Sequence, residues 1–331
     1  MSENYFDSFT QSIPEKKPWQ RYLLHLGLFL VTSVTTLLAG IEWTTGKAGP
    51  FELTDFYQGL PYTLSILFIL GVHEFGHYFA AVYHKVKVTL PYFIPFPPIP
   101  GFINFGTMGA VIKTKSVIPT NKAMFDIGVA GPVSGFIACL LVLIYGFTNL
   151  PGQNYLLQIH PDYFSPEYGK NAIGLEFGNT LLFVIMKNIF VNPSQFFPPM
   201  SEIYHYPYLC VGWFGLFVTA MNLIPVGQLD GGHIIYSMFD EKKQEAIASI
   251  SMIILIVLGV VGVINPIFNL GLHFGWSGWL FWALILYFFI KVKHPPVQHF
   301  EELSPGRKML GYAAILIFIL SFSPTPLILS F

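Results

Sequence analysis

Seven long apolar stretches constrain the fold of this chain more than any other feature. A helix needs roughly 20 residues to cross a hydrocarbon layer of about 30 Å, and each stretch approaches or exceeds that length. They cover residues 22–39, 60–82, 124–147, 208–226, 247–263, 276–290 and 309–328. We therefore predict an all-α polytopic membrane protein with about seven transmembrane helices. A shorter apolar run, 180–191, is interpreted as an interfacial or re-entrant piece.

Charge is scarce, and its distribution predicts the orientation of the chain. Only 11% of the 331 residues are charged, against about 25% in an average globular protein. With the N-terminus in the cytoplasm, the inner side carries Lys16, Lys17, Arg21, Lys85, Lys87, Lys113, Lys115, Lys122, Lys242, Lys243, Lys291, Lys293, Arg307 and Lys308. The outer side carries Lys47, Lys170 and Lys187. This asymmetry follows the positive-inside rule.

The ends and the rarer residues add further expectations. Residues 1–20 are polar and are predicted to form a cytoplasmic tail, followed by one membrane-embedded domain over 21–331. No removable signal or transit peptide is recognised, which favours a bacterial-type inner membrane.

The 17 basic and 18 acidic residues nearly cancel, so nucleic acid is not an expected partner. The apolar composition makes the lipid bilayer the expected partner. Cys139 and Cys210 lie in apolar runs and indicate neither a disulfide nor a thiolate site.

An H-E-x-x-H motif lies inside the second apolar stretch, as His73, Glu74 and His77. Two histidines four residues apart project from one face of a helix and can bind one metal ion. At this composition the motif would occur by chance about 0.01 times in such a chain. Ionisable groups are costly at membrane depth, so a zinc site with Glu74 as general base is the favoured interpretation. The alternative is a pair of core histidines hydrogen-bonded to a buried glutamate.

A zinc hydrolase site needs a third protein ligand. The best candidate is Asp230, because Pro225 and Gly227 would end the fourth apolar helix and turn the chain inward. The alternative for Asp230 is a turn or capping carboxylate. Three other histidines are not assigned as ligands: His233 and His294 are expected in cytoplasmic loops, and His84 at the membrane interface. The external segment 147–207 shows no metal-ligand spacing.

Residues 90–115 interrupt the helical pattern. Five prolines within 91–100 preclude a regular helix, and residues 107–114 suit a short extended strand. Irregular backbone at membrane depth is tolerated where protein covers it or where it lines water. We predict a re-entrant loop and edge strand beside the active site; a surface cytoplasmic loop is the alternative. In the third apolar stretch, Gly128, Gly131 and Gly135 are predicted to allow close helix packing.

Two motifs in order give the chain a resemblance to a known family. The first is H-E-x-x-H, and the second is N-x-x-P-x-x-x-L-D-G, present here as Asn222, Pro225, Leu229, Asp230 and Gly231. G-T-M-G-A at 106–110, A-G-P at 130–132 and H-P-P at 294–296 extend the likeness. The chain thus resembles the site-2 protease family of intramembrane zinc metalloproteases, in a compact form without a PDZ or cystathionine-synthase-type domain.

The resemblance implies hydrolysis of peptide bonds within the membrane. One zinc ion per chain would be bound by His73, His77 and Asp230, with Glu74 as base and Asn222 near the substrate. The substrates implied are single-pass transmembrane proteins or leftover signal peptides.

A transmembrane helix shields its own carbonyl groups, so a substrate must unwind before hydrolysis. The strand residues Thr107, Met108 and Gly109 are expected to bind the unwound segment by strand addition.

Two other functions remain open from the sequence. A zinc protease resembling the prenyl-protein endopeptidases would take a glutamate from a later helix, and none is suitably placed after the motif. A multispan metal-binding transporter or a noncatalytic scaffold would need the ligands alone. Glu74 favours catalysis, because a protein that only binds metal does not need a base next to a ligand.

Overall fold

The computed structural model describes residues 18–47, 49–97, 99, 103–169 and 174–330, and this part of the chain is mostly helical. Its α-helices are α1 (Pro18–Thr45), α2 (Leu53–Tyr83), α3 (Asn121–Thr148), α4 (Gln153–Ile159), α5 (Leu181–Phe190), α6 (Pro207–Leu223), α7 (Asp230–Phe239), α8 (Glu241–Phe268), α9 (Gly278–Ile285) and α10 (Pro305–Ser321). A 3-10 turn η1 (Ile203–His205) precedes α6, and a π-helical turn η2 (Leu286–Ile290) continues α9. The strands are β1 (Tyr92–Pro95), β2 (Thr107–Val111), β3 (Gly174–Phe177) and β4 (Leu327–Ser330).

The helices make this a multi-pass membrane protein. Four of them, α1, α2, α3 and α8, are long and apolar enough to cross a membrane, while α5, α6 and the α9–η2 segment are shorter apolar helices. Each of the seven predicted stretches coincides with a helix for most of its length. The prediction for the last stretch, 309–328, is wrong at its end, because α10 stops at Ser321 and β4 then pairs antiparallel with β3.

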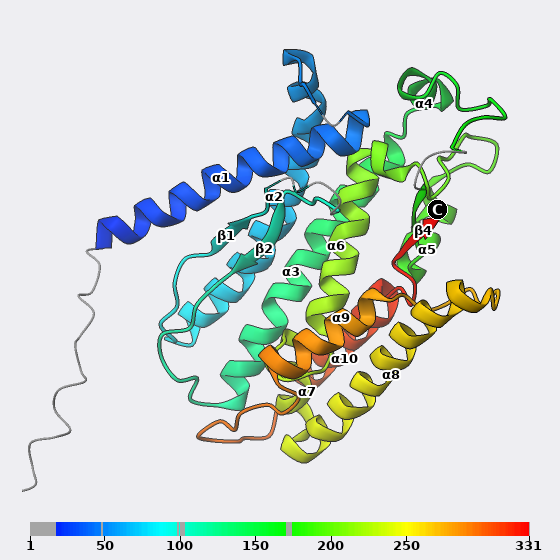
Figure 1. Cartoon of the computed structure of the whole chain (residues 1–331). Coiled ribbons are helices and arrows are strands. Elements are labelled where there is room, and N and C mark those ends of the chain that lie inside the picture. The colour runs from blue at the N-terminus through cyan, green and yellow to red at the C-terminus, as the bar shows by residue number, and fades with distance from the viewer. Residues whose placement is uncertain (1–17, 48, 98, 100–102, 170–173, 331) are drawn as a thin grey trace, which may run out of the picture.

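The interior of the bundle is formed by α2, α3 and α6 (Figure 1). α1 crosses over α2 on one side, while α8 and α9 pack together on the other side. α4 lies at one end of the bundle and α7 at the opposite end. We call these the α4 end and the α7 end. The predicted tail, 1–20, lies outside the described residues except for its last three, which already belong to α1. No PDZ or cystathionine-synthase-type domain is inserted within the described ranges.

Within the segment 90–115, β1 and β2 form a two-stranded sheet that packs on α1. β1 and β2 pair antiparallel, and Phe93 and Ala110 face the core. Before β2, the Gly106 carbonyl accepts a hydrogen bond from Thr35 Oγ1 at 2.6 Å. Gly106 has a φ of +74°, and a Cβ there would lie 2.4 Å from the Thr36 Cα, so glycine is required. The predicted strand is real but shorter than expected, ending at Val111.

The chain reverses sharply between α6 and α7, as Pro225 and Gly227 predicted. Gly227 has a φ of +53°, and its missing side chain leaves room for the Lys291 carbonyl. A Cβ at Gly231 would lie 2.1 Å from the Leu223 carbonyl oxygen. The turn can therefore close tightly enough to begin α7 at Asp230.

Candidate metal centre

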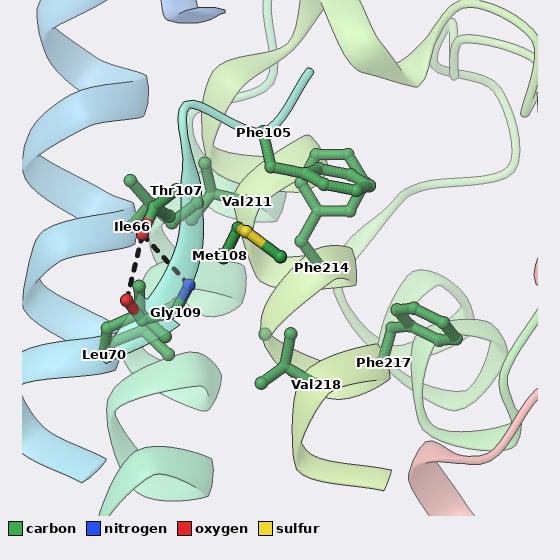
Figure 2. A pocket seen from close by; sticks show the side chains of 12 residues that line it. Ile66, Leu70, Phe105, Thr107, Met108, Gly109, Val211, Phe214, Phe217 and Val218 are labelled. Atoms are coloured by element: carbon green, nitrogen blue, oxygen red, sulfur yellow. Dashed lines mark hydrogen bonds between the residues drawn. The ribbon is translucent and has the colours of Figure 1, made fainter. Parts of the chain in front are cut away.

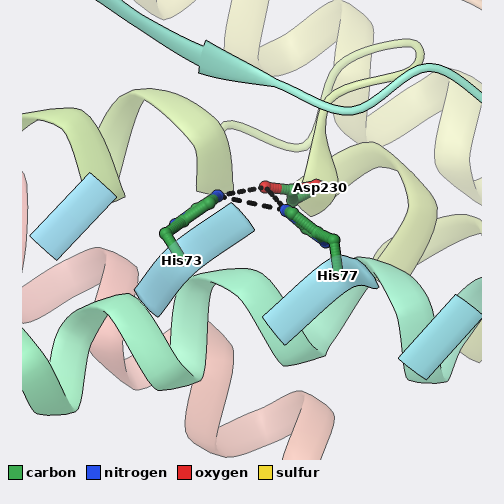
Figure 3. Close-up of side chains that lie close together, drawn as sticks. All are labelled: His73, His77 and Asp230. Carbon is green, nitrogen blue, oxygen red and sulfur yellow. Dashed lines mark hydrogen bonds and ion pairs between the residues drawn. The ribbon is translucent and has the colours of Figure 1, made fainter. Parts of the chain in front are cut away.

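His73, His77 and Asp230 meet in the interior of the bundle (Figure 3). The two Nε2 atoms are 3.1 Å apart, and they lie 3.5 Å and 3.4 Å from Asp230 Oδ2. Both histidines are buried and come from adjacent turns of α2, whereas the carboxylate comes from the first residue of α7. Asp230 points at the histidines and does not cap its own helix, so the turn-carboxylate alternative does not describe it.

These separations fit a zinc ion without rearrangement of the three side chains. Ligand atoms about 2.0–2.1 Å from a tetrahedral zinc are separated from one another by about 3.3 Å. The three observed distances, 3.1, 3.4 and 3.5 Å, bracket that value. Two imidazoles and one carboxylate also form a ligand set that zinc uses in hydrolases, with a fourth position left for water or substrate.

Hydrogen bonding and helix packing fix the orientation of the histidines. His77 Nδ1 lies 2.7 Å from the Ile127 carbonyl oxygen, which can only accept, so Nδ1 carries the proton and Nε2 presents its lone pair. α3 passes directly behind the rings: a Cβ at Gly131 would lie 2.1 Å from His77 Nε2, and one at Gly135 would lie 2.9 Å from His73 Nδ1. The close packing predicted for these glycines is confirmed, and it occurs against the side chains of His77 and His73.

A cavity of about 280 Å³ opens onto these three side chains. Glu74 lines it from the same helix, beside the backbone of Ile112 just after β2. Asn222 lines it from the last turn of α6, with Nδ2 3.5 Å from His73 Nε2. Liquid water occupies about 30 Å³ per molecule, so the cavity has room for water beside a substrate peptide bond.

The predicted substrate-binding residues of β2 line a second, apolar cavity of about 210 Å³ (Figure 2). Thr107, Met108 and Gly109 face Ile66 and Leu70 of α2 and several apolar side chains of α6. The same three elements also line the 280 Å³ cavity beside the candidate metal centre, to which they contribute His73, Ala110, Val111 and Asn222. The two cavities therefore follow one another along α2, β2 and α6.

The three histidines not assigned as ligands lie outside the triangle of His73, His77 and Asp230. His233 lies in α7 and not in a loop as expected, and its Nδ1 is 2.7 Å from His294 Nε2. His84 was expected at the membrane interface, and in the structure its Nε2 lies 2.8 Å from Asp126 Oδ2.

Asp126 also accepts two hydrogen bonds from the Arg307 guanidinium, at 2.8 Å and 2.7 Å. Sequence reasoning did not find this ion pair, which links α3 to α10.

One expectation about the external segment is wrong. His160, Glu202 and His205 come within 4.8 Å of one another at their ligand atoms. The signal that could have found them is the Glu-x-x-His spacing of Glu202 and His205, which places both side chains on one side of a helical turn. His160 is distant in sequence and carries no such signal.

A multi-pass bundle that buries two histidines of an H-E-x-x-H helix beside an aspartate has the architecture of membrane-embedded metallopeptidases. The chain belongs to peptidase family M50, whose family model matches residues 61–261. It is 31% identical over 245 residues to the probable zinc metalloprotease EGY1, chloroplastic, of Oryza sativa subsp. japonica, covering 67% of this chain and 38% of that protein. For the EGY1 protein of Arabidopsis thaliana the identity is 30% over 243 residues, covering 67% and 40%.

A third relative is the probable zinc metalloprotease EGY2, chloroplastic, of Arabidopsis thaliana. It is 25% identical over 264 residues, which cover 79% of this chain and 41% of the relative. The aligned part of the chain thus spans less than half the length of each of these three relatives.

Proposed function

We propose that this chain is an intramembrane zinc metalloprotease that hydrolyses peptide bonds within or near the membrane spans of single-pass proteins or signal peptides. The observation that carries the proposal is the triangle of His73, His77 and Asp230, with ligand-atom separations that match zinc, open to a cavity that Glu74 also lines. Membership of family M50 supports the same chemistry.

Each residue of the site has a distinct role in this proposal. His73, His77 and Asp230 hold one zinc ion, which when bound supplies a Lewis acid that acidifies water and polarises a carbonyl group. Glu74 accepts the proton of the attacking water and returns it to the amine leaving group. Asn222 has an amide N–H at the cavity wall and donates it to the oxyanion that develops on the scissile carbonyl.

The substrate segment is proposed to lie in the apolar cavity before it reaches the site. β2 has a neighbouring strand, β1, on one side only among the described residues. An unwound substrate can therefore add to the free edge at Thr107, Met108 and Gly109, exchanging its internal hydrogen bonds for bonds to the strand. Because α2, β2 and α6 line both cavities, a segment bound there extends toward Glu74.

The topology belongs to the same proposal. Seven helices, α1, α2, α3, α6, α8, α9–η2 and α10, cross the membrane as one domain over 21–331, with the tail and the α7 end in the cytoplasm. The positive-inside distribution supports this orientation. α6 is shorter than a lipid-exposed span, but most of its side chains are covered by other helices. A bacterial-type inner membrane stays a prediction, and the relatives are named as chloroplastic.

The test is cleavage of a single-pass substrate in vesicles, measured together with the zinc content of the protease. Glu74→Gln should retain zinc and lose cleavage by about 100-fold or more, because general acid–base catalysis contributes that much. Asp230→Asn should lose both zinc and cleavage. Glu241→Gln, an exposed carboxylate at the start of α8, is the matched control and should change neither. Equal cleavage by the native protein and Glu74→Gln would reject the assignment and favour the transporter or scaffold alternative.

A further inference from the structure

A second group of potential metal ligands lies at the α4 end, away from the candidate active site. His160 follows α4, Glu202 immediately precedes η1, and His205 is the last residue of η1. The Nε2 atoms of the two histidines are 2.8 Å apart, and Glu202 Oε2 lies 3.7 Å from His205 Nε2. The histidines are 45 residues apart in sequence, so the fold and not the local motif brings them together.

The orientation of His205 matches that of a metal-ligating histidine. Its Nδ1 lies 3.1 Å from the Thr44 carbonyl oxygen near the end of α1. A carbonyl oxygen only accepts, so Nδ1 carries the proton, and Nε2 directs its lone pair into the group. Ligating histidines are typically held by such a bond from the other ring nitrogen. His77 at the candidate active site is held in the same way by the Ile127 carbonyl.

Glu202 supplies an independent observation. Its side chain is buried, with 4% of the residue exposed. Oε1 accepts a hydrogen bond from the Tyr168 hydroxyl at 3.2 Å, whereas Oε2 has no hydrogen-bond partner. A buried carboxylate oxygen without a partner is costly. That oxygen lies on the side of His205 Nε2, where a cation would satisfy it.

We propose that His160, Glu202 and His205 form a second metal site that binds a divalent transition ion such as Zn²⁺. Two imidazoles and one carboxylate form a ligand set suited to zinc. Ligand atoms of a tetrahedral zinc are separated by about 3.3 Å. Glu202 Oε2 and His205 Nε2, now 3.7 Å apart, must therefore approach slightly, and the two Nε2 atoms, now 2.8 Å apart, must separate slightly. His160 is only half-buried, so its ring can make this adjustment, and its proton moves from Nε2 to Nδ1 when Nε2 binds the ion.

The position of the site indicates a structural role. The ion would join the segment after α4 to the turn that begins α6, and the bond from His205 to the Thr44 carbonyl extends the connection to α1. By joining His160 to His205, the ion would cross-link the two ends of a long loop. Metal binding of this kind stabilises the folded chain. This site is independent of the proposed protease activity, since it shares no residue with His73, His77 and Asp230.

The experiment counts zinc in the purified full-length chain after equilibration with ZnCl₂ and removal of excess metal. The native protein should hold two zinc ions, Glu202→Gln one, Asp230→Asn one, and the double variant none. Glu202→Gln preserves the shape of the side chain and can still accept from Tyr168, so the fold should be kept. His273→Gln, an exposed histidine elsewhere, is the control and should leave two.

A second measurement isolates the proposed site and does not depend on protease activity. In the Asp230→Asn background, cobalt should give the absorption bands of a low-symmetry, four-coordinate ion, and adding His205→Gln should abolish them. Zinc should also raise Tm in that background, but not when Glu202→Gln is added. The proposal would be overturned if the native protein held a single zinc ion that Asp230→Asn lost and Glu202→Gln kept. His160 and His205 would then be only a hydrogen-bonded pair. A second zinc unaffected by both Glu202→Gln and His205→Gln would overturn it equally.

Discussion

At the scale of single residues, the candidate metal centre depends on two glycines of α3, because a larger residue at either position would collide with a histidine. α3 packs against the ligand rings with Gly131 behind His77 and Gly135 behind His73. The sequence pattern of small residues predicted close helix approach, but it did not show which side chains fill the space. The contact of each glycine with a histidine joins α3 to α2, whereas the periodicity of a sequence describes one helix at a time.

Gly131→Ala should therefore act on the metal centre more than on the fold. Its new methyl group would lie 2.1 Å from His77 Nε2, so the ring must move. Alanine is by itself more favourable than glycine in a helix, by about 1 kcal/mol. We expect zinc affinity to fall about 10–100-fold, the range found when groups that orient metal ligands are altered. Zinc titration checks this. Gly27→Ala, which adds a methyl group in open space, is the control, and unchanged zinc affinity in Gly131→Ala would contradict the prediction.

His294 predicts a loss of stability in acid. Burial, followed by the neighbouring His233, lowers the pKa of His294 to about 4 from an ordinary value near 6.5. Between these two pH values the unfolded chain binds a proton that the folded chain does not bind. The free energy of unfolding must therefore fall as the pH decreases through this window. Between pH 7.5 and 5.5 the loss from this residue should be about 1 kcal/mol.

Thermal unfolding of the native protein and His294→Gln at pH 7.5 and 5.5 tests this expectation. The glutamine oxygen can still accept a hydrogen bond from His233 Nδ1, but it does not titrate. The decrease in Tm on acidification should be smaller in the variant by about 2 °C. An identical decrease in both proteins would show that His294 does not contribute.

At the scale of elements, the sequence predicts those features that local patterns encode. The helical placement of the H-E-x-x-H motif, the strand after Gly106 and the turn at Pro225 and Gly227 follow from periodicity and turn chemistry. Two features could not be predicted in this way: the pairing of β3 with β4 and the bidentate contact of Asp126 with Arg307. Each joins segments more than 100 residues apart, and such pairings depend on the assembled bundle.

The free edge of β2 predicts that Met108→Pro slows cleavage more than it reduces folding. Met108 is 71% exposed beside the apolar cavity. Proline removes one backbone N–H from the strand, and with it a donor to an added substrate strand. Cleavage should fall about tenfold, the effect of losing roughly 1.4 kcal/mol of substrate interaction. Met108→Leu, which keeps the N–H, should cleave normally. Parallel losses of Tm and cleavage in the proline variant would remove the support for strand addition.

At the scale of the whole molecule, the fold separates the two ends of the bundle. α4 and the group of His160, Glu202 and His205 lie at one end, whereas α7 begins near the candidate active site toward the other end (Figure 1). Hydropathy predicted the bundle, and charge predicts its orientation, but neither showed which residues of the segment 147–207 converge. The end that faces the cytoplasm determines which compartment supplies water to the cavity beside Glu74, so the orientation is part of the mechanism.

Labelling of single cysteines tests this orientation directly. Cys139 and Cys210 are fully buried, so the native protein should react little with a membrane-impermeant maleimide. Asn154→Cys at the α4 end should be labelled from the external side of intact cells. Lys242→Cys, at the start of α8 next to the α7 end, should be labelled only after the membrane is opened; both positions are exposed. The reverse pattern would place the α7 end outside the cytoplasm, and labelling of both from one side would exclude an odd number of crossings between them.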